Sequence, residues 1–212
     1  HSTGLRNPTL YELYGSDNYG IGGNTNLRPE KSKSNELFGE FNFSEKLKFT
    51  STAYKSKVFD RIETNEAYSE HENKLIDINQ EGVENELIFR EKDKKFSIFT
   101  NFTKSRKANG QAQSRRPDLS YGANYAKKFQ TNFFGPFTFN LNYKYTGEYV
   151  DWDGSANSKQ KSTDLVDISI KKNWYVNIIS LNITNLLNER YEKPATYSQD
   201  GRRFGIQLRR AY

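Results

Sequence analysis

Residues 176–212 read VNIISLNITNLLNERYEKPATYSQDGRRFGIQLRRAY, and this stretch decides the fold. Apolar and polar residues alternate one by one at 179–184, and they alternate again at 204–209. A period of two gives a β-strand one apolar and one polar face. The stretch therefore predicts a β-hairpin whose apolar face needs a covering layer. No other segment of the sequence provides a second layer to cover it.

The same alternation recurs along the whole chain. Its clearest example runs from Phe137 to Tyr149, and no heptad pattern or helical stripe is present. Turn signals divide the sequence into about ten segments of this kind. We therefore expect an all-β chain with strands at residues 1–6, 34–44, 46–61, 79–91, 95–105, 118–129, 136–149, 163–172, 176–185 and 202–212.

The connections between these segments alternate strictly between short and long. The short turns lie near residues 44–46, 93–94, 130–135 and 172–174, and the long polar loops at 9–33, 62–78, 106–117, 150–162 and 187–201. Tight turns on one side and extended loops on the other are typical of a transmembrane β-barrel. Strands of about 10–14 residues are also long enough to cross a bilayer at a tilt of about 45°. The sequence thus predicts an antiparallel transmembrane β-barrel wall.

Composition supports a membrane barrel more than a soluble core. The chain has 212 residues, of which 34% are hydrophobic, yet it contains 14 Tyr and 15 Phe. A wall with one face in lipid and one in water combines aromatic residues with a polar average. Tyr and Trp near strand ends, such as Tyr149 and Trp174, fit the aromatic girdles of such a wall. No stretch approaches the roughly 18 apolar residues that a membrane helix requires.

Charge and sulfur content exclude several classes of function. The net charge is +6, but 32 basic residues are interleaved with 26 acidic ones, so we predict no nucleic-acid partner. The positive charge also predicts, as a secondary role, attraction to anionic lipid headgroups at the outer surface. Without cysteine the chain has no disulfide framework and no thiolate metal site. It also lacks methionine and a signal peptide, so we expect the carboxyl-terminal piece of a longer polypeptide.

Five stretches, taken in order, resemble the TonB-dependent outer-membrane receptor family. They are GLRNPTLYELY at 4–14, NTNLRPEKSKS at 24–34, GVE at 82–84, RRP at 115–117, and the closing pair NLLN at 185–188 with GRRF at 201–204. Each motif is of limited specificity alone, but together they extend over nearly the whole chain. The sequence departs from the family at its end, where Tyr212 stands in place of the usual Phe.

The resemblance implies a 22-stranded barrel around an amino-terminal plug, of which residues 1–212 would be the last ten strands. It implies an active transporter of the Gram-negative outer membrane and not an enzyme. The relatively short loops are most similar to those of vitamin B12 (cobalamin) receptors, with ferric siderophore receptors next. Implied partners are TonB through an upstream region, outer-membrane lipid and lipopolysaccharide, and the barrel-assembly machinery through the strand from Phe204 to Tyr212.

No arrangement of residues indicates catalysis, a metal or a cofactor. The two histidines have no metal-ligand spacing, and Asp151 to Gly154 starts like a calcium loop but lacks the later carboxylate. A receptor instead needs aromatic and polar groups at its extracellular mouth. In the vitamin B12 receptors that the chain resembles, an arginine at the position of Arg115 faces the ligand. The predicted ligand-binding residues are Arg115, Arg116, Tyr11, Tyr14, Tyr19, Tyr68 and Trp152.

Two other classes remain open at this point. A passive porin has the same strands and loops but needs no plug, and the 24–34 motif speaks against it. A soluble β-sandwich acting as a binding module needs apolar faces that pack on each other. Buried cores favour Val, Ile and Leu over so many Tyr, which speaks against the sandwich.

Overall fold

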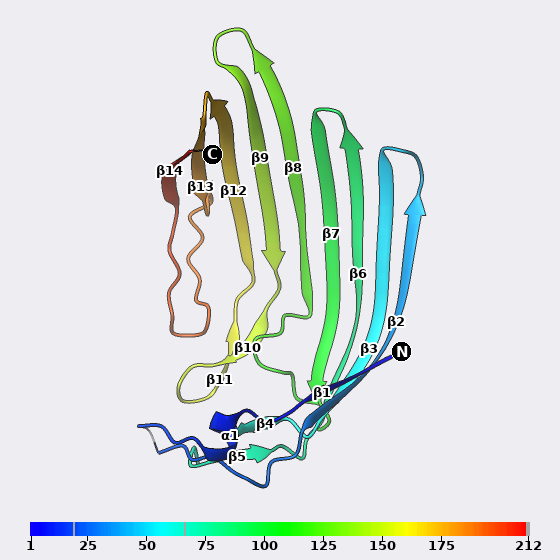
Figure 1. The fold of residues 1–212 in the computed structure, drawn as a ribbon, viewed down its shortest axis with the longest axis vertical. Coiled ribbons are helices and arrows are strands. Elements are labelled where there is room, and N and C mark those ends of the chain that lie inside the picture. Colours follow the sequence, from blue (N-terminus) through cyan, green and yellow to red (C-terminus); the bar gives the residue numbers. More distant parts are fainter. Residues whose placement is uncertain (19, 66, 211–212) are drawn as a thin grey trace. The chain divides into compact units, whose positions relative to one another are not determined.

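The computed structural model describes all residues except 19, 66, 211 and 212, so Tyr19 and Tyr212 lie outside the described residues. Its main feature is one ten-stranded sheet in the order β1-β2-β3-β6-β7-β8-β9-β12-β13-β14 (Figure 1). The strands are β1 Ser2–Arg6, β2 Glu30–Asn42, β3 Leu47–Phe59, β6 Ile78–Glu91, β7 Lys94–Lys107, β8 Leu119–Thr131, β9 Gly135–Thr146, β12 Thr163–Trp174, β13 Asn177–Thr184 and β14 Arg203–Arg210. These ten strands confirm the predicted all-β fold.

Cross-strand register gives the sheet two chemically different faces. In the antiparallel pair β8–β9, Tyr121 lies opposite Tyr145 and Tyr125 opposite Leu141. On the other face of the same pair, Asn124 lies opposite Asn142. Partners in register share a face, so the alternation in the sequence becomes an aromatic face and a polar face.

The sheet has no second layer in the described part of the chain. Only five apolar side chains there are buried, namely Leu27, Ile62, Ile78, Ile88 and Ala195. By contrast, Phe204 and Ile206 of β14 are 74% and 81% exposed. A single sheet that leaves its apolar side chains uncovered excludes the soluble β-sandwich. No helix among the described residues is long and apolar enough to cross a membrane.

The connections alternate as predicted, but the long ones have structure of their own. One contains a five-residue helix, α1 (Leu10–Tyr14), which begins at a capping box formed by Thr9 and Glu12. Two others contain small hairpins, β4 (Ile62–Thr64) with β5 (His71–Asn73), and β10 (Tyr149–Trp152) with β11 (Asn157–Gln160). The sequence predicted long polar loops here and did not predict these short elements within them.

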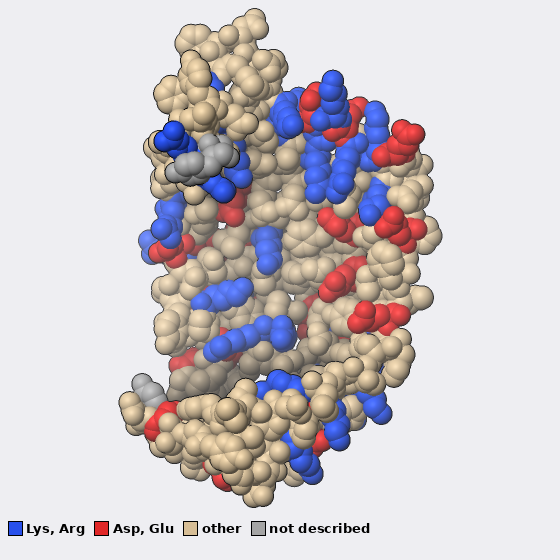
Figure 2. Space-filling model, in the orientation of Figure 1, with Lys and Arg blue, Asp and Glu red and all other residues tan. Residues whose placement is uncertain are grey.

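The chain divides into two compact units. Unit 1 comprises residues 1–37, 53–82 and 104–113, and unit 2 comprises 38–52, 83–103 and 114–212. Figure 2 shows that basic and acidic side chains are interspersed over the face in view rather than gathered in one stripe. Each unit contains its own loop structure.

Candidate functional site

The centre of the loop structure in unit 2 is the carboxylate of Asp151, which is completely buried in hairpin β10–β11. Its Oδ1 accepts hydrogen bonds from Arg115 Nε at 2.8 Å and from the Trp152 amide at 2.9 Å. Its Oδ2 accepts from the amide of Ala195 at 2.9 Å. The Arg115 amide also donates to the Val150 carbonyl at 2.8 Å. One carboxylate therefore joins three long connections.

These hydrogen bonds determine the ionisation of Asp151. Burial raises the pKa of the carboxyl group, but the amide of Ala195 and the guanidinium of Arg115 hold the ionised form, and the net effect is a lowered pKa. A lowered folded-state pKa stabilises the folded protein above the ordinary carboxyl pKa of about 4. That stabilisation is lost as the pH falls through the lowered value. At neutral pH the Asp151 carboxylate is therefore ionised, and its hydrogen bonds between the loops are intact.

A cavity of about 320 Å³ lies beside the Arg115–Asp151 pair. Arg115, Lys144 and Lys193 bring three cationic groups to its lining, whereas Asp151 is the one carboxylate. That carboxylate is already bonded to Arg115, so the cavity carries an excess of positive charge. The remaining lining residues are Pro117, Ser120, Thr146, Tyr149 and Pro194.

The cavity opens on the polar face of the sheet. Ser120 and Thr146 are register partners, and Lys144 lies opposite Gly122, all on the face that carries Asn124 and Asn142. The aromatic residues of the same strands point to the other face. In a barrel whose aromatic face meets lipid, the polar face lines the interior. The cavity is therefore accessible from the lumen at the end of the sheet that bears the long connections.

Unit 1 contains a second loop structure, in which two long connections are joined. Gly22 donates from its amide to Ser69 O at 2.7 Å, and the Asn24 side chain donates to His71 O at 3.0 Å. The ring of Tyr11 in α1 packs edge-on against His71, with centroids 5.9 Å apart. A cavity of about 780 Å³ in this unit is lined by both signs of charge, with Lys74 bonded to Glu72 at 2.7 Å. Its charges largely neutralise one another.

The predicted site residues fall into both units. Arg115 lines the cationic cavity, Arg116 follows it in the same connection, and Trp152 is half exposed next to Asp151. Tyr11, Tyr14 and Tyr68 belong to unit 1, where Tyr14 and Tyr68 are 71% and 63% exposed.

Sequence reasoning did not identify Asp151, Lys144, Tyr149 and Lys193 as parts of one site. Alternation along β9 places Lys144 on the polar face and could have identified it. No comparable pattern marks Lys193.

The calcium-loop likeness at residues 151–154 has a different structural explanation. Asp151 is occupied by the bonds described above, and Asp153 Oδ1 accepts from the amides of Ser155 and Ala156, each at 2.9 Å. Both carboxylates thus serve the geometry of the β10–β11 hairpin. Within the described residues, no group of three or more potential metal-ligating side chains comes together.

The aromatic and polar faces, the alternating connections and the loop motifs all point to one class of barrel, and the comparison with protein families decides it. The family model "TonB dependent receptor-like, beta-barrel" matches residues 1–186. The chain belongs to this TonB-dependent receptor β-barrel family. Such barrels lie in the outer membrane, and the family consists of transporters and not of enzymes. Their longer loops are extracellular and their short turns periplasmic.

Solved structures with the same fold include uptake receptors and a transporter. The ferric yersiniabactin uptake receptor FyuA of Yersinia pestis superposes with a TM-score of 0.73 at 20% identity, over 87% of this chain and 30% of that one. The copper transporter OprC superposes with a TM-score of 0.75 at 14% sequence identity, over 99% of this chain and 36% of that one. The ferripyoverdine receptor of Pseudomonas aeruginosa superposes with a TM-score of 0.68 at 17% sequence identity, over 87% of this chain and 27% of that one. At these identities the likeness establishes the fold.

The chain spans about a third of the length of these structures. No curated protein sequence gives a significant match.

Proposed function

We propose that this TonB-dependent receptor chain forms the last ten strands of a 22-stranded barrel that imports an anionic metal chelate of the ferric siderophore class. The cationic cavity around Arg115 carries the proposal. Solved structures of the same fold include a receptor for ferric yersiniabactin and one for ferripyoverdine, which supports the ligand class. Import would draw energy from TonB, whose contact lies outside these residues. A passive porin does not account for the family match.

Charge favours a siderophore over cobalamin as the ligand of this cavity. Siderophores that bind iron through catecholate or carboxylate oxygens are anionic as ferric complexes. Arg115 donates one of its five guanidinium N–H groups to Asp151, and this hydrogen bond fixes the guanidinium in the wall of the cavity. Lys144 and Lys193 add two further cations. Cobalamin is a large, nearly neutral ligand and would rely more on stacking, so its transport stays a prediction that rests on loop length.

The other predicted residues have a secondary place in this proposal. Trp152, Tyr11, Tyr14 and Tyr68 offer exposed aromatic surface on the extracellular loops, where a bulky chelate needs stacking area. Arg116 adds a positive charge to the connection that contains Arg115. Tyr19, which lies outside the described residues, keeps the role that its sequence position predicts.

We also infer that β14 is the segment that the barrel-assembly machinery recognises. It is the last strand in the sheet order, and Phe204, Ile206 and Leu208 present a row of exposed apolar side chains on one face. An unpaired edge of this kind is available for strand pairing during assembly.

The ligand proposal is tested by removing charge from the cavity in the full-length protein. Lys144→Gln combined with Lys193→Gln is expected to weaken binding of a ferric catecholate complex by about 30-fold or more, because two charge-assisted contacts are lost. Tryptophan fluorescence titration or calorimetry measures the affinity. The same variant is expected to bind a neutral ferric hydroxamate and cyanocobalamin as the parent protein does.

Lys159→Gln combined with Lys161→Gln is the matched control. Both residues follow Asp151 in the same connection but do not line the cavity, and Lys159 is paired with Glu148 at 2.5 Å. The control changes net charge equally and is expected to leave the affinity within about twofold. Equal losses in both double variants, or unaltered catecholate binding in the first, contradict the proposal. Tight cyanocobalamin binding to the parent protein would instead assign the receptor to cobalamin.

A further inference from the structure

Three short polar side chains form a hydrogen-bonded row on the aromatic face of the sheet, where lipid contact predicts apolar residues. Ser51 of β3 donates from its hydroxyl to Asn85 Oδ1 at 2.8 Å, and Asn85 Nδ2 donates to Thr100 Oγ1 at 3.2 Å. Asn85 lies on β6 and Thr100 on β7, so the row crosses three neighbouring strands. We call these three residues the polar ladder, and all of them belong to unit 2.

The strand register establishes which face the polar ladder occupies. Thr100 lies opposite Tyr121 of β8, one of the aromatic residues of this face. Asn85 and Ser51 share the face because their side chains continue the same row of hydrogen bonds. Phe49 lies two positions from Ser51, and residues two positions apart in a strand point to the same side. The polar ladder is therefore part of the surface that meets lipid.

The polar ladder lies near the middle of the apolar band. Ser51 is four positions from the short-turn end of β3, and Asn85 and Thr100 are each six positions from the short-turn ends of β6 and β7. At about 3.4 Å per residue and a tilt of about 45°, these positions are roughly 10–14 Å above the turns. The apolar band of such a barrel is about 25 Å tall. At the same height β9 carries Leu141, which lies opposite Ile168 of β12.

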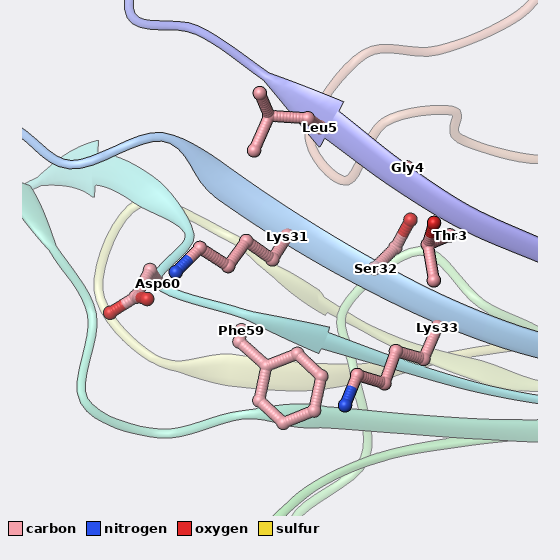
Figure 3. A pocket seen from close by; sticks show the side chains of 8 residues that line it. All are labelled: Thr3, Gly4, Leu5, Lys31, Ser32, Lys33, Phe59 and Asp60. Carbon is pink, nitrogen blue, oxygen red and sulfur yellow. The ribbon is translucent and has the colours of Figure 1, made fainter.

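The polar ladder differs from the lysines at the end of β2. Lys31 and Lys33 lie within the first four residues of that strand, at a groove where Lys33 extends toward the Phe59 ring (Figure 3). A long lysine side chain at a strand end reaches water. The short side chains of the polar ladder cannot reach water from the middle of the band. Their hydrogen-bond partners must therefore lie within the membrane.

Part of the Asn85 amide is not used by the polar ladder. A side-chain amide has two N–H donors and an oxygen that can accept two hydrogen bonds. Asn85 donates once and accepts once, and its side chain forms no further hydrogen bond within the described residues. The residue is only half-buried, and a donor and acceptor left against hydrocarbon are unfavourable. The unused groups fit a partner that offers a donor and an acceptor together, as another amide does.

Exposed apolar side chains surround this amide on the same face. Val83 lies two positions along β6, and Ile98 and Phe102 lie two positions to either side of Thr100 on β7. They offer contact surface to a neighbouring protein in the membrane. A single polar group within an apolar contact selects register and partner, as a buried asparagine does in coiled coils. The patch thus combines an apolar contact surface with one amide that gives specificity.

We propose that the receptor pairs with a second copy of itself through this patch, with Asn85 close to a two-fold axis along the membrane normal. Two copies with the same orientation in one bilayer are related by such an axis, so a residue close to it meets its own counterpart at the same depth. The two Asn85 amides then exchange two N–H···O hydrogen bonds. No other partner is guaranteed to present a complementary group at this depth. The pairing does not depend on the ligand, because the ligand cavity opens on the polar face.

Disulfide trapping in native outer membranes tests this geometry. In the full-length receptor, Asn85→Cys and Leu141→Cys place a thiol on the same face, each six positions from a short turn. A disulfide needs Cα atoms about 5.5 Å apart, so mild oxidation links only residues close to the axis. We expect Asn85→Cys to form a species of twice the receptor's mass, whereas Leu141→Cys and the parent protein, which is the background control, remain monomeric. Absence of the product at position 85, equal cross-linking at both positions, or a product of another mass overturns the proposal.

A second pair of variants measures the contribution of the amide. Ser51→Ala with Asn85→Leu removes the bonded pair from the lipid-facing surface. Ser169→Ala with Asn140→Leu is the matched control, because it removes an equivalent pair, 3.1 Å apart, from the polar face. Energy transfer between labelled receptors in lipid vesicles is expected to show about tenfold weaker association for the first variant, since two intramembrane hydrogen bonds are lost, and a change within about twofold for the control.

Heat-modifiable migration in electrophoresis verifies that each variant is folded. Association of the first variant that equals that of the parent, or equal losses in both double variants, contradicts the proposal. A parent receptor that shows no energy transfer above the level of random collision overturns it as well.

Discussion

Replacing Leu181 by arginine is expected to lower the free energy of unfolding of the full-length barrel by about 2–4 kcal/mol. Leu181 lies opposite Ile170 and Ile206 on the aromatic face. It is four positions into β13, which places it about 10 Å above the short-turn end and near the middle of the apolar band. An arginine there must put a charge into hydrocarbon or distort the strand to reach water. Equilibrium unfolding in guanidinium from lipid vesicles measures the change.

The neighbouring residue provides the control for this experiment. Asn182 lies opposite Ser169 and Gly205 on the polar face, which meets the lumen. Asn182→Arg adds the same side chain one position along the strand, in contact with water instead of lipid. We expect a change below about 1 kcal/mol for this variant. If Asn182→Arg proves to be the more damaging substitution, the assignment of the two faces is reversed.

The second large effect is expected from Asp151→Ala, which removes the acceptor that joins three extracellular connections. The amides of Trp152 and Ala195 lose their partner, and leaving buried donors unsatisfied costs about 1–3 kcal/mol each. Arg115 also loses the bond that fixes its guanidinium. Hydrogen exchange by mass spectrometry is expected to show at least tenfold faster exchange in peptides covering 108–118, 147–162 and 187–201.

Asp153→Ala is the control, because it tests whether the effect is specific to the hydrogen bonds by which Asp151 links three connections or arises from the loss of any turn-capping carboxylate. Asp153 accepts only from Ser155 and Ala156 among the bonds described for its carboxylate, so its removal is expected to affect exchange in the β10–β11 turn alone. Exchange at 108–118 and 187–201 is expected to stay at the parent rate. Unaltered exchange of those two segments in Asp151→Ala would show that other contacts hold the loops together.

The sheet was predictable from the sequence because the alternation of apolar and polar residues is a local pattern and recurs in every long strand. Alternation over ten or more residues identified the strands to within a few positions. For example, the predicted strand 79–91 is β6 from Ile78 to Glu91. The short elements within the loops were missed because three or four residues, as in β4 and β10, are too few to show a period. The Thr9–Glu12 capping box was a usable sign of α1, because Ser or Thr followed three positions later by Glu marks a helix start.

The ligand cavity could not be derived in the same way. Asp151 bonds to groups 36 and 44 positions away in the chain, and no local pattern reports such contacts. Arg115 was predicted as a ligand residue from family resemblance, and the structure gives it a structural bond as well. Its neighbours Lys144 and Lys193 come from different connections and strands. Burial and charge pairing between distant segments are properties of the folded chain, and they decide where the positive charge gathers.

The orientation of the sheet in the outer membrane is the central claim, and cysteine labelling tests it most directly. Residues 1–212 contain no cysteine, so each single variant adds one thiol to this region, and the parent protein is the background control. Ala156→Cys lies in the exposed turn between β10 and β11, and Glu45→Cys lies in the exposed short turn between β2 and β3. In intact cells, a membrane-impermeant maleimide is expected to label Ala156→Cys and leave Glu45→Cys unlabelled until the outer membrane is permeabilised. Labelling of Glu45→Cys in intact cells, with protection of Ala156→Cys, would contradict the account.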